Sequence, residues 1–285
     1  MNSLMIPKWK SYITQFETVA LQVTQNGTVL LVETEQAEAL MNMKRSYHFI
    51  VQIIAEDTHT TVDLYDVPII PSHVDLFSDG SILLVQYTSV RNHNIVERNA
   101  WRYSQKGELL DAFVLGHGVN HMQIDETDVV WVGYSDEGVF DELGYGKEGL
   151  VAYNQKGEEI FSVDYSGMAE IYALNVVHSK EIYFYYYMDY HVIGLSNNQE
   201  ILNIAPQQKE PAYTFDSFIL CNNQIFASVD LYTCMRFEIE QNQLIPKEEF
   251  ELVDQQSKKL EGLVRMRGKY LFVFTEDAIY KREFV

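Results

Sequence analysis

The sequence predicts an all-β protein, a six-bladed β-propeller built from four-stranded blades. Aromatic residues make up 13% of its 285 residues and only 6 are proline, a composition that favours strands. A hairpin signature, consisting of an apolar strand, a polar turn and a second apolar strand, recurs along the chain. The recurrences lie 43 to 53 residues apart, close to the blade period of roughly 40–50 residues.

Each predicted repeat begins with one hairpin and continues with a second. The anchors of the first turns are Gly27, Gly80, Thr127, Lys180, Asn223 and Gly268. The second turns lie at Glu56–Thr60, Ser104–Glu108, Asn154–Glu158, Asn197–Glu200 and Gln241–Gln243. Gly and Asn favour such turns because they adopt positive φ angles most readily. Two hairpins in succession give the four strands of a blade.

The repeats predict a single domain over residues 1–285. The blades are expected at about 18–68, 69–116, 117–166, 167–206, 207–253 and 254–285, the last with residues 8–17. The sixth repeat has three strands, and Trp9–Phe16 alternates like a strand. We therefore expect this N-terminal segment to complete the C-terminal blade and close the ring, which removes open sheet edges. A pair of β-sandwiches is the alternative, but no Pro-, Gly- or Ser-rich linker divides the chain.

Two classes of loop differ in length. The hairpin turns are short, whereas the loops between second and third strands, and between blades, are long. These long segments are Glu33–Ser46, Ser89–Asn99, Ser135–Gly149, Met188–His191 and Gln207–Thr214. Glu33–Ser46 is expected as one short helix or a mobile loop. Elaborated loops on a rigid scaffold commonly carry function, so the long-loop face is the candidate binding face.

Charge and composition limit the possible partners. Asp and Glu total 41 and Lys and Arg total 21, giving a net charge of −20. Nucleic acid and anionic membranes require clustered Lys and Arg, so neither is an expected partner. The N-terminus lacks the pattern of a signal peptide, and a cytoplasmic location is expected. Two cysteines, Cys221 and Cys234, are too few for a disulfide framework.

Counting back from the turn anchors places polar residues where the innermost strands begin. His73, Asn120, Asp216 and Glu261 fall there, with His121 one residue away. Carboxylate and amide oxygens suit calcium or magnesium, so Asn120, Asp216 and Glu261 are candidate ligands of a divalent cation at the channel mouth. The alternative is that these groups hydrogen-bond backbone groups where blades meet.

The loop Ser135–Gly149 contains five acidic residues, one lysine and four glycines. Its candidates for binding a cation or a basic partner are Asp136, Glu137, Gly138 and Phe140. A solvated acidic loop is the alternative. Tyr187 and Tyr190, beside another long loop, are candidates for a stacking surface that would take a sugar or a peptide.

The same region resembles an uncharacterised bacterial family of six-bladed propeller-like proteins. The likeness covers Gly118–Tyr187 and includes Val130–Tyr134, which matches an Ile-Trp-Val-x-Tyr pattern, and Asp136–Phe140, which matches Asp-Glu-Gly-Val-Phe. Asn120-His121 stands where the family has an Asp-Gly start, and Asp141 replaces a glycine. The resemblance implies the fold and no known activity.

A weaker resemblance is to propellers of the senescence-marker/gluconolactonase group. Glu261-Gly262, Asn120 and Asp216 are similar in type and placement to that group's metal ligands, whereas His73 is foreign to the pattern. The resemblance implies a divalent metal in the channel, and it is an analogy of fold.

These observations predict a binding module that engages a protein or a small ligand through its long-loop face. The alternative is a divalent-metal-dependent hydrolase or lactonase with its site at the channel mouth. The sequence contains no phosphate-binding loop and no nucleophile elbow, and it does not decide whether the protein is an enzyme.

Overall fold

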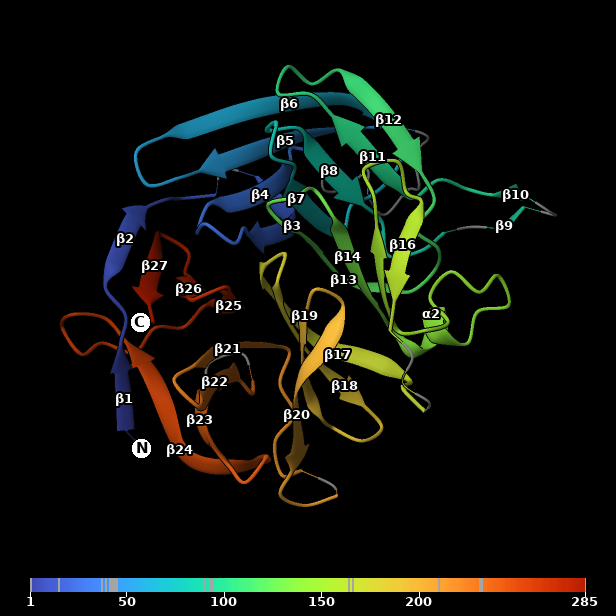
Figure 1. Cartoon of the computed structure of the whole chain (residues 1–285). Helices are drawn as coiled ribbons and strands as arrows, with labels where there is room; N and C mark the ends of the chain where they lie inside the picture. The colour runs from blue at the N-terminus through green and yellow to red at the C-terminus, as the bar shows by residue number, and fades with distance from the viewer. Residues whose placement is uncertain are drawn as a thin grey trace. The chain divides into compact units, whose positions relative to one another are not determined.

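The computed structural model describes residues 2–284 except 15, 37, 39, 41–45, 90, 93, 94, 164, 166, 210, 231 and 232. The chain divides into two compact units, a first unit of Gln15–Ile171 and a second unit of Met1–Thr14 with Tyr172–Val285. Both are built from strands that pair mainly antiparallel (Figure 1), and the second unit also has two parallel pairings. The predicted single domain stays a prediction. The described residues include no helix long and apolar enough to cross a membrane.

The first unit contains three four-stranded sheets, each formed by strands in chain order. The first sheet is β3 (Glu17–Val23), β4 (Val29–Thr34), β5 (Tyr47–Ile54) and β6 (His59–Val67). The second is β7 (His73–Leu76), β8 (Ile82–Val85), β11 (Ala100–Tyr103) and β12 (Leu109–Phe113). The third is β13 (Val119–Ile124), β14 (Val130–Tyr134), β15 (Leu150–Tyr153) and β16 (Glu159–Ser162). β9 (Arg91–Asn92) pairs with β10 (Ile95–Val96), and α2 covers Asp136–Val139.

The second unit contains one four-stranded sheet and one nine-stranded sheet. The four-stranded sheet is β25 (Leu263–Arg267), β26 (Tyr270–Phe274), β27 (Ala278–Glu283) and β2 (Lys8–Ser11). The nine-stranded sheet has β17 (Glu170–His178), β18 (Glu181–Tyr187), β19 (Val192–Ser196), β20 (Gln199–Pro206), β21 (Ser217–Cys221), β22 (Gln224–Ser228), β23 (Thr233–Glu240), β24 (Gln243–Val253) and β1 (Asn2–Met5). β2 pairs with β27, as predicted for the N-terminal segment.

The fold is an all-β propeller with four-stranded blades, but the prediction of six blades is wrong. Four blades stand as separate four-stranded sheets. The strands of the fourth and fifth repeats do not form two separate blades, because β20 pairs with β24 at Ala205–Gln243 and Pro206–Leu244. Turn spacing carries no information about such edge pairing, and long outer strands with open edges pair readily.

The predicted turns are confirmed. Gly27, Gly80 and Gly107 have φ angles near +80°, which only glycine adopts at low cost. At Gly107 a Cβ atom would also lie 2.3 Å from the backbone oxygen of Asp63. Asp128 (φ +67°) takes the left-handed position in the third repeat, one residue after the predicted anchor. The helix-or-loop prediction for Glu33–Ser46 falls half outside the described residues, and its first two residues, Glu33 and Thr34, belong to β4.

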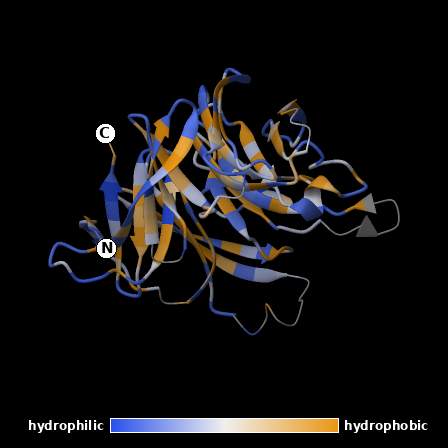
Figure 2. Cartoon of the chain, turned by 90° about the horizontal axis from the view of Figure 1, so that it is seen from below, coloured by the Kyte–Doolittle hydropathy of each residue, from blue (hydrophilic) through white to orange (hydrophobic). Residues whose placement is uncertain are grey.

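Each unit has its own hydrophobic core. In the first unit, apolar residues of adjacent sheets pack together, for example Leu83, Val85 and Phe113 of the second sheet with Val132 of the third. In the second unit, Leu4 and Ile6 pack among residues of β21 to β27. Much of the hydrophobic colour lies on the strands, and many connecting loops are hydrophilic (Figure 2). The aromatic run Tyr183–Tyr186 of β18 is buried and belongs to the core.

Candidate functional site

In the first unit, α2 is held by a hydrogen-bonded group of polar side chains. The Tyr87 hydroxyl lies 2.8 Å from Ser135 Oγ and donates to Glu137 Oε2 at 3.1 Å. Nε2 of His117 lies 3.2 Å from the same carboxylate oxygen. Burial raises the pKa of Tyr87, with a smaller contribution from Glu137. This group joins the β8–β11 loop, the β12–β13 connection and α2 on one side of the unit.

The other candidates of the Ser135–Gly149 loop differ in exposure, since Gly138 is buried whereas Asp136 and Phe140 are exposed. Gly138 is required by packing, because a Cβ there would lie 2.4 Å from the carbonyl oxygen of His117. Asp136 begins α2 and is exposed. Phe140 follows α2 with 73% of its surface exposed. Tyr87 and His117 were not identified from the sequence, because they lie 50 and 20 residues from Glu137.

The inner-strand candidates of the first unit hydrogen-bond to neighbouring backbone. His73 donates through Nε2 to the carbonyl oxygen of Val119 at 2.8 Å. Asn120 donates to the carbonyl oxygen of Ile171 at 3.0 Å and to Glu170 Oε1 at 3.2 Å. Asn120 occupies a bulge in β13, which re-aims its side chain. His121 pairs with Gly133 across the same ladder.

The two candidates of the second unit lie just before inner strands. Asp216 precedes β21, and burial raises its pKa while the Arg265 guanidinium opposes the rise. Asp216 is exposed to solvent, although nearby protein atoms partly desolvate its carboxyl group. Glu261 precedes β25, is exposed, and lines an open groove with Asp254, Lys258 and Tyr280.

The predicted metal site stays a prediction. Asn120 belongs to the first unit, and Asp216 and Glu261 belong to the second. Among the residues that the structure describes, no three His, Cys, Asp or Glu side chains form a group that could hold a metal ion. Asp216 already faces Arg265, a cation that competes with a metal for its charge.

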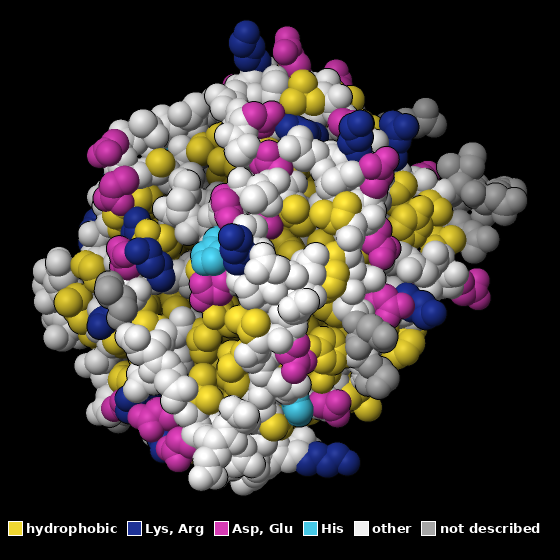
Figure 3. All heavy atoms as spheres, viewed as in Figure 1, with side chains coloured by type: hydrophobic (Ala, Val, Ile, Leu, Met, Phe, Trp, Pro, Cys, Tyr) yellow, Lys and Arg dark blue, Asp and Glu magenta, His cyan; other side chains and the backbone are white. Residues whose placement is uncertain are grey.

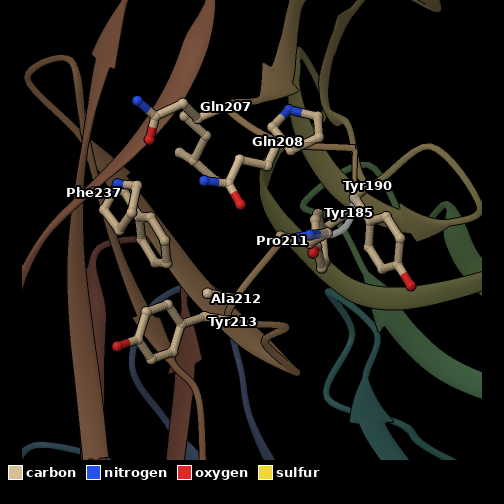
Figure 4. Close-up of a pocket in the computed structure, with 11 residues that line it drawn as sticks. Tyr185, Tyr190, Gln207, Gln208, Pro211, Ala212, Tyr213 and Phe237 are labelled. Atoms are coloured by element: carbon tan, nitrogen blue, oxygen red, sulfur yellow. The ribbon is translucent and has the colours of Figure 1, made fainter.

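A cavity of the second unit, which we call the aromatic pocket, lies between two halves of the nine-stranded sheet (Figure 4). Its volume is about 60 Å³. One water molecule needs roughly 10–15 Å³, so the cavity has room for a few water molecules or for part of a small ring. It is lined by Tyr185, Tyr190, Pro206, Gln207, Gln208, Pro211, Ala212, Tyr213, Phe237, Leu244 and Pro246.

Strand pairing assembles the aromatic pocket. Pro206 and Leu244 are partners in the β20–β24 ladder, and both line the pocket. Phe237 lies opposite Pro246 beside a bulge in the β23–β24 ladder. Proline has no backbone N–H to donate, so its place is an outer strand or a bulge. Half of the chain's six prolines line this one cavity.

A tight turn places Tyr190. Its backbone N–H donates to the carbonyl oxygen of Tyr186 at 3.0 Å, and its φ angle is +59°, a conformation uncommon outside glycine. The Tyr190 ring packs 6.1 Å from Tyr185 and 5.4 Å from Tyr187, between ring centroids. Tyr185 in turn stacks on Phe215 at 4.0 Å. The aromatic wall is therefore fixed by the core behind it.

The aromatic pocket has a neutral lining among the residues that the structure describes, since none of those that line it carries a charged side chain. Burial raises the pKa of Tyr185, with smaller contributions from Tyr190 and Tyr172, so its hydroxyl stays protonated. In Figure 4, Phe237 and Tyr213 line one side and Tyr185 and Tyr190 the other. The hydroxyls of Tyr190 and Tyr213 point away from the space, and Gln207 and Gln208 lie along one edge.

The sequence identified this pocket in part. Tyr190 was a stacking candidate and lines the pocket, whereas Tyr187 packs behind it against Tyr172 and Tyr190. Gln207–Thr214 and Met188–His191 were both predicted as long loops, and both contribute lining residues. Phe237, Leu244 and Pro246 were missed, because only the pairing of β20 with β24 brings them to these loops.

Comparisons with known proteins support the fold. No family model matches the chain, and no curated protein matches it. A streptogramin B lyase structure is similar over 99% of this chain and 86% of its own, with a TM-score of 0.52 and 9% identity. A protein of unknown function from Bacteroides thetaiotaomicron is similar over 98% of this chain and 73% of its own, with a TM-score of 0.52 and 10% identity.

A chain from a crystal structure of the mitotic checkpoint complex is also similar. It covers 98% of this chain and 92% of its own, with a TM-score of 0.50 and 6% identity. Likeness at such low identity supports the all-β propeller and brings no activity with it. The two family resemblances drawn from the sequence stay predictions.

Proposed function

We propose that this protein is a binding module that holds an uncharged, ring-sized apolar group in the aromatic pocket. The single observation that carries the proposal is a neutral cavity walled by aromatic and proline side chains in a chain of net charge −20. Concave, mostly apolar cavities with a few convergent polar groups are the usual form of ligand sites. Here the polar groups are the amides of Gln207 and Gln208.

The pocket's chemistry selects against charge. An ionised ligand would lose its hydration without gaining an opposite charge among the lining residues, and such burial is costly. An apolar ring gains contact with Tyr185, Tyr190 and Phe237, and aromatic pairs contribute roughly 0.5–1.5 kcal/mol beyond area burial. The ligand class is therefore uncharged and cyclic.

Ligand-observed NMR with small cyclic probes tests the proposal. We expect p-cresol and N-acetylprolinamide to bind with a Kd on the order of 1 mM, as fits fragments of about ten non-hydrogen atoms. Benzoate should bind at least about tenfold more weakly, because its charge must be desolvated. Ala212→Trp should abolish binding, since Ala212 is an exposed lining residue and tryptophan would fill the cavity.

Thr214→Trp is the matched control. Thr214 is exposed in the same loop but does not line the pocket, so this variant should bind the probes as the unmodified protein does. Binding that survives in Ala212→Trp, or no binding of any cyclic probe, would contradict the proposal. Circular dichroism of both variants checks that each is folded.

Other functions drawn from the sequence stay predictions. A basic partner at Ser135–Gly149 has the exposed Asp136, Glu137 and Phe140 in its favour. A metal-dependent hydrolase or lactonase would require Asn120, Asp216 and Glu261 to share one cation. Among the described residues, no three His, Cys, Asp or Glu side chains form a group that could hold a metal ion.

A further inference from the structure

Proline is the peptide residue that the aromatic pocket can bury at least cost. Its ring is uncharged and compact, which suits a cavity of about 60 Å³. It also has no N–H group, so its burial leaves no unpaired donor among apolar walls. A sugar ring carries several hydroxyl donors, and besides tyrosine the described lining residues include only two with polar side chains, Gln207 and Gln208.

The edge of the pocket suits an extended chain. A polyproline II segment forms no internal hydrogen bonds, so its carbonyl groups are free to accept them. The side chains of Gln207 and Gln208 lie along the edge of the cavity (Figure 4), and both residues are exposed. Their amide groups are placed to donate to carbonyls of a chain whose ring enters the pocket. Aromatic-lined grooves are the usual docking site for such segments.

Charged residues stand beside the lining residues in the sequence, seven of them acidic and three basic within three positions of a lining residue. On β23 and β24, Arg236 and Lys247 are paired with glutamates. Successive side chains of a strand point to opposite faces, so Arg236 and Glu238 lie on the face opposite Phe237. Charge therefore acts on a ligand through the net charge of the chain, which is −20.

On a wider scale, acidic and basic side chains are dispersed over the face shown in Figure 3. The net charge of −20 gives the chain a negative field. Such a field speeds the approach of a positively charged partner and slows that of a negative one. A ligand that combines an uncharged ring with basic neighbours is complementary to both the apolar pocket and the negative charge of the chain.

We propose that the occupant of the aromatic pocket is a proline-rich segment of another protein, with lysine or arginine on either side of the prolines. This inference rests on the proposed function and names its partner. One proline ring enters between Phe237 and Tyr190, and the chain runs past Gln207 and Gln208. The flanking basic residues are attracted by the net charge of the chain, which is −20.

Fluorescence anisotropy with short labelled peptides tests this partner. The probe has a proline-rich core and a lysine at each end. One comparison peptide replaces each proline by alanine, and another replaces each lysine by glutamate. We expect the alanine peptide to bind at least about tenfold more weakly. The glutamate peptide should be about tenfold weaker at low salt, and this difference should shrink in 0.5 M salt, where charges are screened within about 4–5 Å.

The pocket variants connect the peptide to its site. Ala212→Trp should bind the lysine peptide at least about tenfold more weakly than the unmodified protein, and Thr214→Trp should bind it equally well. Equal binding of the proline and alanine peptides, or of the lysine and glutamate peptides at low salt, would overturn the inference. If p-cresol binds and is blocked by Ala212→Trp while no peptide binds, the proposed function stands and this partner is wrong. If neither class binds, both are wrong.

Discussion

Polar side chains on the inner strands connect neighbouring strands through backbone hydrogen bonds. In the first unit His73 reaches Val119 and Asn120 reaches Ile171. In the second unit the buried Asn175 donates to the carbonyl of Phe218 and accepts from the N–H of Gly268. A buried polar group costs stability unless it is paired, and these contacts satisfy it. Residue type alone did not distinguish this role from metal binding, because the same amide and imidazole groups suit both.

The pKa of the Glu170 carboxyl group tests the position of a single neighbouring residue, Asp136 of α2. The pKa of Glu170 is raised above the usual 4.5, first by burial and then by the negative charge of Asp136. Asp136→Asn removes that charge, so the pKa of Glu170 should fall. A carboxyl ¹³C NMR titration measures it, with Asp141→Asn as the matched control in the same loop. A pKa that stays unchanged in Asp136→Asn would contradict the placement of α2 beside Glu170.

The raised pKa of Glu170 also determines in which direction the stability of the fold changes with pH. The folded protein holds the Glu170 proton more tightly than the unfolded chain does. The stability contributed by this group is therefore present below the unfolded pKa and is lost as the pH rises through the folded pKa. In Asp136→Asn this loss should be smaller, because the two pKa values lie closer together.

At the scale of elements, the N-terminal strand β1 covers an edge. β1 pairs in parallel with β24, from Asn2–Phe250 to Met5–Val253. Leu4 and Ile6 enter the core beside Leu252. Because β24 is the outer strand of its hairpin, β1 supplies partners for backbone groups that would otherwise be open to another chain. The sequence predicted the pairing of β2 but not this strand, because Asn2–Met5 is too short for a clear alternation.

Ile6→Ala tests the contribution of this segment. Ile6 is completely buried, so its truncation should lower the free energy of unfolding by about 2–5 kcal/mol. The exposed Ser3 of β1 gives a control, because Ser3→Ala should change it by less than about 0.5 kcal/mol. Urea denaturation measures both. Equal stability of Ile6→Ala and the unmodified protein would show that the segment is not anchored as described.

At the scale of the whole molecule, the sequence predicted local features better than the number of sheets. Turn positions follow from the local conformations of residues such as Gly80 and Gly157, so they could be predicted from the sequence. The joining of β20 to β24 depends on Pro206 meeting Leu244 through space. No local pattern encodes that meeting, which is why the predicted number of blades was wrong and why Phe237, Leu244 and Pro246 were not identified as pocket residues.

Intermolecular NOEs test most directly whether the aromatic pocket holds an uncharged ring. With saturating N-acetylprolinamide, the ring protons of the probe should show NOEs to the aromatic protons of Tyr190, Tyr213 and Phe237, since all three line the cavity. The same NOEs should be absent in Ala212→Trp. NOEs from the probe only to residues outside the pocket, or no NOEs at all in the unmodified protein, would show that the aromatic pocket does not hold the ring.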